Sequence, residues 1–269
     1  MLLPYTARIL GFLLILFSFS QLIPVFIAYL YQENLEIKGF LYAFSISITL
    51  GLILFILSKN SAEELKTRDG FIITFFFWTV LALFGSLPFY FADFRSISYI
   101  DSLFESISGL TTTGATVFFG LDEMPKSILF YRQFLQWLGG MGIIVLAVAV
   151  LPLLGVGGMQ LYKAETPGPL KSSKLTPRIT ETAQALWYVY LTMTFVCAIL
   201  YYFSGMTAFD SICHAFSTIS IGGFSTHDQS FAYFESYYTQ WVAMIFMLIA
   251  GINFALHFTA WSKSKINRL

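Results

Sequence analysis

The 269-residue sequence contains few charged residues, 11% of the chain, and few cysteines. A soluble globular domain carries about 25% charged residues, so the low share, together with 57% hydrophobic residues, excludes an ordinary soluble domain and indicates a membrane protein. Basic and acidic residues balance at 15 each, so nothing in the bulk charge suggests nucleic acid as a partner. The two cysteines, Cys197 and Cys213, lie in apolar surroundings, where a disulfide framework is not expected.

The N-terminus lacks a small-residue cleavage site. Arg8 precedes an apolar run that continues to about Tyr31, so we expect a retained transmembrane helix and not a signal peptide. A helix that crosses the hydrocarbon core needs roughly 20 predominantly apolar residues. Six stretches meet this requirement, approximately 9–30, 39–58, 70–91, 130–154, 183–203 and 238–260. The sequence therefore predicts an all-α polytopic membrane protein surrounded by membrane lipids.

Two shorter helices are expected between these spans, near 98–110 and 207–219. At a rise of about 1.5 Å per residue, each reaches only about half way across the membrane. Each leads into a hydroxyl-rich turn that contains glycine. The two segments match at one constant offset, which pairs Asp101 with Asp210, Ser102 with Ser211, Ser108 with Ser217 and Gly114 with Gly223. A short helix followed by such a turn, present twice, is the pattern of a re-entrant pore loop.

The basic residues predict the orientation of the chain. With a cytoplasmic N-terminus, the inner side holds Arg8, Lys59, Lys66, Arg68, Lys163, Lys171, Lys174, Arg178, Lys263, Lys265 and Arg268. The outer side then holds only Lys38, Arg95, Lys126 and Arg132. Most of the acidic residues are outside: Glu33, Glu36, Asp93, Asp101, Glu105, Asp122, Glu123, Asp210, Asp228 and Glu235. We expect these acids either to concentrate cations near the short helices or to form a plain solvated face.

The two turns suit the passage of a cation. The C-terminus of a helix carries a partial negative charge of about half an elementary unit, which favours a cation there, while Asp101 and Asp210 are expected to cap the opposite ends. In Thr111–Gly114 and Ser220–Gly223 the backbone must turn back in extended or left-handed conformations, so that carbonyl oxygens replace the water around the ion. We expect Gly139, Gly140 and Gly142 of the fourth span to serve close helix packing.

The loops also resemble those of a known family. Ser108–Thr116 and Phe216–Ser225 resemble the first two filter sequences of the TrkH, KtrB and HKT superfamily of potassium transporters. Further similarity lies in Trp137–Ile144, Ala164–Pro169 and Gly251–His257, and these segments look most like bacterial TrkH.

This resemblance implies an N-terminal helix pair followed by repeats of membrane helix, pore helix and membrane helix. The expected divisions are the pair at 1–65, a first repeat at 66–160, a cytoplasmic linker at 161–182 and a second repeat at 183–269. It also implies that potassium ions meet backbone carbonyls in both turns. By position, these belong to Thr111, Thr112, Thr113, Gly114, Ser220, Ile221, Gly222 and Gly223.

The family further implies a homodimer in the bacterial inner membrane that pairs with a cytosolic nucleotide-binding regulator, TrkA. Its members carry four repeats, whereas this sequence shows two, and a pore ringed by four loops cannot close with two. We expect the chain to be the front half of a longer protein, because Lys263–Leu269 resembles an interrupted cytoplasmic connector. A truncated product completed by another chain is the alternative.

Two other functions stay open at this point. An intramembrane enzyme would use His214, His227 or His257 with nearby carboxylates, but no nucleophile, base and orienting acid can be assembled, so we predict that the chain is not an enzyme. A non-conducting fragment that serves only in folding or assembly is the other alternative. Asn253 and His257, four residues apart in the sixth span, suggest an interhelical hydrogen bond or a pore-lining face.

Overall fold

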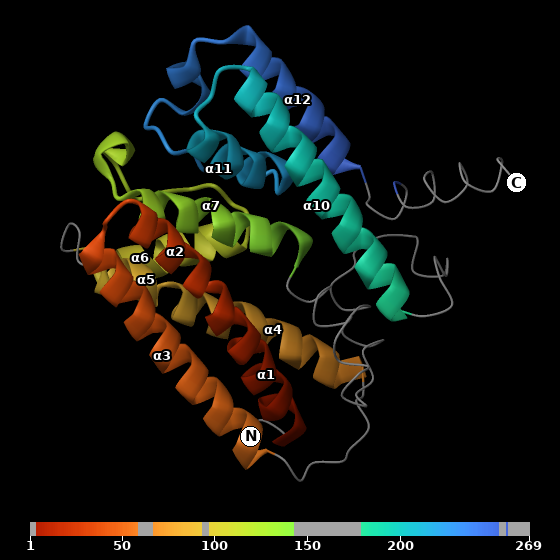
Figure 1. Ribbon diagram of the computed structural model, residues 1–269. Helices are drawn as coiled ribbons and strands as arrows, with labels where there is room; N and C mark the ends of the chain where they lie inside the picture. The colour runs from red at the N-terminus through yellow and green to blue at the C-terminus, as the bar shows by residue number, and fades with distance from the viewer. Residues whose placement is uncertain (1–3, 59–66, 93–96, 143–178, 253–256, 258–269) are drawn as a thin grey trace, which may run out of the picture.

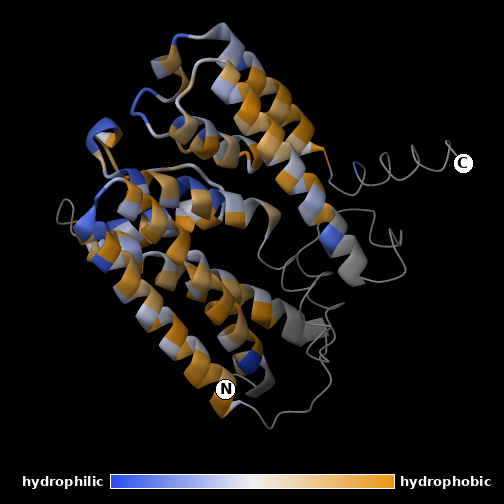
Figure 2. Ribbon diagram, in the orientation of Figure 1, coloured by the Kyte–Doolittle hydropathy of each residue, from blue (hydrophilic) through white to orange (hydrophobic). Residues whose placement is uncertain are grey.

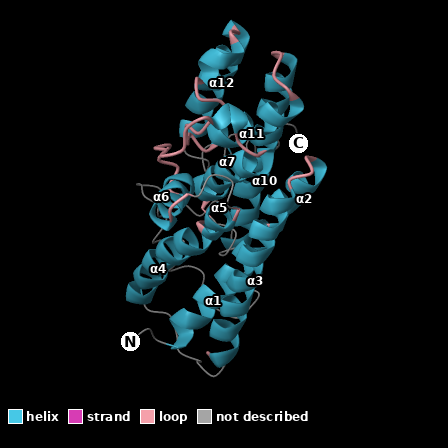
Figure 3. Cartoon of the chain, turned by 90° about the vertical axis from the view of Figure 1, so that its left-hand side faces the viewer, coloured by secondary structure: helices cyan, strands magenta, loops and turns pink. Residues whose placement is uncertain are grey.

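The computed structural model describes residues 4–58, 67–92, 97–142, 179–252 and 257. Regular structure in these residues is helical throughout, with no strand among them (Figure 3), which confirms the predicted all-α class. The helices are α1 (Pro4–Ser20), α2 (Leu22–Leu30), α3 (Asn34–Leu57), α4 (Thr67–Gly85), α5 (Leu87–Phe91), α6 (Tyr99–Leu110), α7 (Lys126–Met141), α10 (Ile179–Phe203), α11 (Ala208–Ile219) and α12 (Tyr237–Gly251), with short 3-10 turns η1 (Leu121–Glu123) and η4 (Ser230–Phe234).

Four helical stretches in the described residues are long and apolar enough to cross a membrane. They are Thr6–Leu30, Asn34–Leu57, Ile72–Phe91 and Leu186–Phe203, and they coincide with the first, second, third and fifth predicted spans. Hydrophobic residues run along these helices, whereas hydrophilic residues concentrate in the loops (Figure 2). Of the predicted sixth span, 238–260, the structure describes the apolar helix α12 and His257.

The predicted fourth span differs in kind from the others. Its described part is α7, which contacts α2, α6 and α11, and most of its side chains are buried in protein. These include Arg132, Gln133 and Gln136, all with no exposed surface. A helix enclosed by protein can hold polar side chains that lipid would penalise by several kcal/mol, so the burial of α7 accounts for the polar residues in this predicted span. The remainder of that span and the linker up to residue 178 lie outside the described residues.

The chain forms two groups of helices that meet along α7 (Figure 1). One core cluster contains side chains of α1 to α7, and a second contains side chains of α10, α11 and α12. The Trp137 ring packs against both clusters, with ring centroids 5.2 Å from Phe216 and 5.6 Å from Tyr190. The central helix α7 is therefore shared between the two groups, and α6 and α11 both contact it.

A carboxylate from the N-terminal part of the chain fixes the start of α7. Glu33 accepts hydrogen bonds from the backbone N–H groups of Lys126 at 2.6 Å and Ser127 at 3.0 Å, and from the Ser127 hydroxyl at 2.5 Å. An anion at a helix N-terminus satisfies otherwise free N–H groups and complements the helix dipole. This contact joins the α2–α3 turn to the helix that carries the central polar residues.

Candidate functional site

The two short helices predicted near 98–110 and 207–219 are α6 and α11, with 12 residues each. Their caps differ from the prediction. Ser98 and Thr207 are the N-caps, and their hydroxyl oxygens accept from the backbone N–H of Asp101 and Asp210 at 3.1 Å in both cases. The aspartates stand at the third helical position and accept from those hydroxyls at 2.7 and 2.6 Å. A hydroxyl residue three positions before an acid is the capping-box signature, and it was visible in the sequence.

The first helix ends in a Schellman motif. The N–H of Thr112 donates to Gly109 O at 3.0 Å, and the N–H of Thr113 donates to Ser108 O at 2.9 Å. This pair of bonds satisfies helix carbonyls that would lack a partner, and it requires a left-handed residue after the cap. Glycine usually fills that position, but here it is Thr112, with φ of 52°.

The second helix ends in the same way at the matching positions. Ile221 N–H donates to Thr218 O at 3.1 Å, and Gly222 N–H donates to Ser217 O at 2.8 Å. Ile221 takes the left-handed position, with φ of 55°. A positive φ at a β-branched residue is a genuine outlier, and such strain persists only where the surroundings hold it. The left-handed residue occurs at matching positions in both segments, Thr112 and Ile221, so the two turns have the same backbone conformation.

Each turn contains a second left-handed residue, and this one is glycine as predicted. Gly114 has φ of 77° and Gly223 has φ of 85°. The expectation that glycine supplies the left-handed geometry is confirmed at these two positions. The left-handed threonine and isoleucine two residues earlier were not identified from the sequence, because neither residue type favours that conformation.

The structure brings the two turns together. A Cβ atom built on Gly114 would lie 2.2 Å from the Gly222 carbonyl oxygen and 3.5 Å from Gly223 Cα, so the two loops are in direct contact. A Cβ atom built on Gly223 would meet nothing within 4 Å. Among the eight predicted site residues, Ser220 and Gly222 are buried, and the other six are partly or fully exposed. Coordination of an ion by these backbone carbonyls stays a prediction.

Glycines of α7 allow the helix to touch the ends of both short helices. A Cβ atom at Gly139 would lie 1.9 Å from Leu110 O, and one at Gly140 would lie 2.6 Å from Ser220 Cβ. The predicted role of these glycines in close packing is therefore confirmed, since any side chain would push the helices apart. Gly142 follows the last residue of α7 with φ of 71°.

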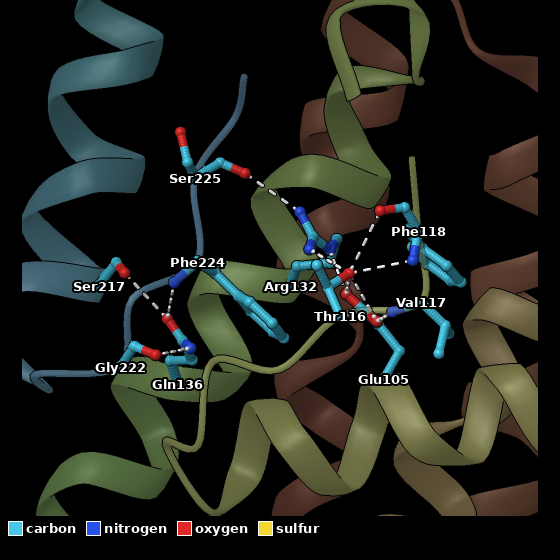
Figure 4. Close-up of polar contacts among 10 residues, drawn as sticks. All are labelled: Glu105, Thr116, Val117, Phe118, Arg132, Gln136, Ser217, Gly222, Phe224 and Ser225. Carbon is cyan, nitrogen blue, oxygen red and sulfur yellow. Dashed lines mark hydrogen bonds and ion pairs between the residues drawn. The ribbon is translucent and has the colours of Figure 1, made fainter. Parts of the chain in front are cut away.

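Two buried side chains of α7 hold the segments around the turns, and neither was identified from the sequence as a site residue (Figure 4). The nearer is Gln136. Its Nε2 donates to Gly222 O at 2.7 Å, while its Oε1 accepts from the Ser217 hydroxyl at 2.9 Å and from Phe224 N–H at 3.2 Å. The Gly222 carbonyl thus has a donor within the protein, and its second lone pair remains for any other partner.

The second side chain is Arg132, one helical turn before Gln136. Its guanidinium donates through Nε to Glu105 Oε1 at 2.6 Å, through Nη1 to Ser225 O at 3.1 Å and through Nη2 to Thr116 Oγ1 at 3.0 Å. Arg132 and Glu105 have no exposed surface. A solvated face, one of the two expectations for the acidic residues, is therefore wrong for Glu105, and also for Glu36 and Asp210, which are 6% and 5% exposed. The side of the membrane on which Arg132 and Glu105 lie stays a prediction. A buried charge requires partners, and sequence position alone did not show them.

The short helices α6 and α11 use equivalent contacts to hold the segments that follow the turns. Thr116 donates its hydroxyl to Glu105 Oε1 at 2.9 Å, and at the matching positions Ser225 Oγ lies 3.0 Å from His214 Nε2. His214 Nδ1 lies 2.9 Å from Asp210 O. Arg132 contacts Thr116 and Ser225 together. His214 is therefore a fully buried residue with both ring nitrogens engaged.

The loop after the first turn and the loop after the second turn meet in one further polar contact. His227 Nδ1 is hydrogen-bonded to Asp122 Oδ1, and its Nε2 lies 3.4 Å from Asp210 Oδ1. The His227 ring stacks on Tyr233 at 3.5 Å between centroids. The hydrogen bond to His227 lowers the pKa of Asp122 below its ordinary value. His227 thus has polar and aromatic partners from both loops.

The remaining sequence candidates lie elsewhere. His257 Nε2 lies 3.0 Å from Ile249 O, and Asn253 is outside the described residues, so the structure does not describe their pairing. Cys197 and Cys213 are free and buried. Within the described ranges, no group of three or more histidine, cysteine, aspartate or glutamate side chains could hold a metal ion. The polar groups at the two turns are mainly backbone groups and hydroxyls.

Comparison with known proteins places the chain among transport proteins. A family model described as TrkH, cation transport protein, matches residues 36–269. The Trk system potassium uptake protein TrkH of Vibrio parahaemolyticus is 55% identical over 260 residues, which are 97% of this chain and 53% of that protein. The protein of the same name from Escherichia coli K12 is 52% identical over 255 residues, 95% of this chain and 53% of that protein.

A solved structure agrees with these matches. The crystal structure of the potassium transporter TrkH from Vibrio parahaemolyticus superposes on the chain with a TM-score of 0.84 and 51% identity, covering 99% of this chain and 53% of that one. The chain therefore spans about half the length of the relatives that it matches.

Proposed function

Because the chain belongs to the TrkH family of cation transport proteins, we propose that it contributes two of the loops that line a potassium-selective pathway. In this proposal Thr111–Gly114 and Ser220–Gly223 present backbone carbonyl oxygens to a dehydrated potassium ion. The ion is the transported substrate. The enzyme alternative is not retained, because the matched family transports cations and the relatives are named potassium uptake proteins.

One observation carries the proposal. The two turns have the same hydrogen bonds and the same alternation of left-handed residues, and they touch where Gly114 meets the Gly222 carbonyl. The shared geometry follows the shared sequence plan of the two segments, and strained positions of this kind persist only where the surroundings hold them. Both short helices also end at these turns, so the partial negative charges of their C-termini favour a cation nearby.

The energy for uptake is available without a nucleotide site in the pore. A membrane potential of about 100 mV contributes about 2.3 kcal/mol per elementary charge that moves inward. That corresponds to roughly a 50-fold concentration ratio at equilibrium. The proposed transport is therefore movement of potassium down its electrochemical gradient, gated from the cytoplasmic side.

The resemblance to TrkH extends the proposal to partners and location. We place the protein in the bacterial inner membrane, with a cytoplasmic N-terminus, as a homodimer regulated by the nucleotide-binding protein TrkA. The chain would provide the N-terminal helix pair and two of four repeats, that is, half of a pore-forming subunit. The match to about half the length of the relatives supports this division.

Rubidium uptake in bacteria that lack their own potassium uptake tests the proposal, with the protein expressed from its complete reading frame. Gly223→Ala is the informative variant, because the left-handed backbone disfavours a side chain there although the space is open. Gly205→Ala is a matched control, since Gly205 also has a positive φ of 104° and open space but lies outside both turns. We expect the wild type and Gly205→Ala to take up rubidium and Gly223→Ala to lose uptake or selectivity. Selective uptake by Gly223→Ala equal to that of the wild type would contradict the assignment of these loops.

A further inference from the structure

Gln136 is the side chain that contacts the second turn most extensively. It belongs to α7, between the two short helices in the chain, yet all its polar contacts described above go to α11 and the loop after it. The side chain has no exposed surface. It also fills the space behind the turn, because a Cβ atom on Gly222 would lie 2.3 Å from Gln136 Cδ. The amide is thus enclosed and directed at the backbone of one turn.

The hydrogen bonds of Gln136 reach the backbone on both sides of Gly223. Its Nε2 holds the carbonyl of Gly222, and its Oε1 holds the N–H of Phe224, so the peptide units on both sides of Gly223 are fixed by one amide group. Gly223 itself has open space around it and φ of 85°. A glycine with that freedom would otherwise leave both flanking peptide units free to rotate.

The first turn has no such support. Thr113 occupies the position that matches Gly222, and no side-chain donor contacts its carbonyl within the described ranges. The two turns therefore share a backbone conformation but not the means of holding it. Loss of one amide at position 136 should disturb the second turn and leave the bonds of the first turn intact.

From this geometry we propose that Gln136 is a positioning residue that sets the ion selectivity of the pathway by fixing the two peptide units around Gly223. The inference rests on the proposed function and deepens it. Discrimination between similar ions by backbone carbonyls depends on the number and placement of the oxygens. A turn held in one conformation therefore discriminates more sharply than one that rotates.

Three substitutions separate the parts of this role. Gln136→Met keeps the length of the side chain and removes both hydrogen-bonding atoms. Gln136→Glu, when ionised, keeps an acceptor for Phe224 N–H but removes the donor to Gly222 O. Gln133→Met is the matched control, because Gln133 lies three residues earlier on the same helix, is equally buried and has no hydrogen-bond partner for either amide atom among the described residues.

The test measures the ratio of rubidium to sodium uptake in cells expressing the complete reading frame, with monodispersity of the purified protein as a check on folding. We expect Gln136→Met to reduce the ratio about tenfold, which corresponds to about 1.4 kcal/mol of discrimination. Gln136→Glu should reduce it as well, and Gln133→Met should leave it within about twofold of the wild type, about 0.4 kcal/mol.

The outcomes distinguish this inference from the proposed function. Absence of rubidium uptake by the wild type would overturn the proposed function, and the inference with it. Uptake by the wild type combined with an unchanged ratio in a monodisperse Gln136→Met would overturn the inference alone, as would an equal loss in Gln133→Met. If Gln136→Met does not fold, Ser217→Ala tests the inference in its place, because it removes only the hydroxyl that donates to Gln136 Oε1. A ratio lowered by at least about twofold supports the inference, and an unchanged ratio overturns it.

Discussion

The buried pair of Arg132 and Glu105 offers the sharpest test of how the segments after the two turns are held together. Arg132→Met removes the guanidinium that contacts Glu105, Thr116 and Ser225, and leaves the Glu105 carboxylate without a cation in a site with no exposed surface. Removal of one partner of a buried ion pair costs about 3–5 kcal/mol. Because both side chains are fully buried, solvent screening does not reduce this figure as it would at the surface.

The expected loss of stability can be followed through the thermal midpoint, the temperature at which half of the detergent-purified protein remains monodisperse. At about 2–4 °C per kcal/mol for a chain near this size, Arg132→Met should lower that temperature by roughly 6–20 °C. Arg132→Lys should lie between the variant and the wild type, since lysine keeps the charge but cannot reproduce the planar fork that reaches three partners.

A second substitution distinguishes electrostatics from simple loss of packing. Glu105→Gln in the Arg132→Met background removes the uncompensated carboxylate and should recover part of the stability, by about 0.5–3 kcal/mol of coupling. The reasoning is refuted if Arg132→Met is as stable as the wild type. It is also refuted if Glu105→Gln lowers the stability of Arg132→Met by as much as it lowers that of the wild type, because the two residues would then not be coupled.

Three other predictions concern the turns, the helix packing and the contact between Asp122 and His227. Gly114→Ala should impair rubidium uptake more than Gly223→Ala. Both variants place an alanine in a left-handed conformation, at a cost of about 1–2 kcal/mol, but only the Gly114 variant would also clash with Gly222 O. Equal effects on uptake would contradict the contact between the two turns. Gly139→Ala should destabilise the purified protein by about 1–3 kcal/mol, measured by the same heating assay, since its Cβ would overlap Leu110 O; an unchanged midpoint would count against this packing. Asp122 has a lowered pKa from its bond to His227, so its stabilisation is full above the ordinary value of about 3.9 and is lost as the pH falls through the lower folded value. The difference in thermal midpoint between the wild type and Asp122→Asn should accordingly close below that pH, and a difference that persists there would refute the assignment.

Much of this architecture could be predicted from local patterns. Apolar length predicted six spans, four of which coincide with long apolar helices in the described residues, and the repeated short helices matched α6 and α11 within a residue. The family match confirms the resemblance that the loop sequences indicated. The reason is physical: helix length, hydroxyl caps and turn glycines act over a few residues, so their pattern is present in the sequence itself.

The partners of α7 could not be obtained in this way. Neither Arg132 nor Gln136 was identified as a buried contact residue, because their partners lie far away in the chain. A signal did exist. Arg132 and Gln136 are four residues apart, so they share one face of an otherwise apolar helix, and polar residues in that setting usually face protein and not lipid. That rule indicates a buried face but not what it contacts.

The left-handed Thr112 and Ile221 also escaped prediction. Both residues are β-branched, and local preference argues against a positive φ at either position. The Schellman bonds of the helix ends and the contact between the loops impose it instead. Glycine positions therefore located the two turns but did not define their full backbone path.

Anomalous diffraction from crystals of the complete protein grown with thallium, a heavy analogue of potassium, tests the central claim most directly. The account predicts anomalous density beside the backbone oxygens of both Thr111–Gly114 and Ser220–Gly223, at a position that the two loops share. Density at another place, or none between these loops at a concentration that supports uptake, would contradict it.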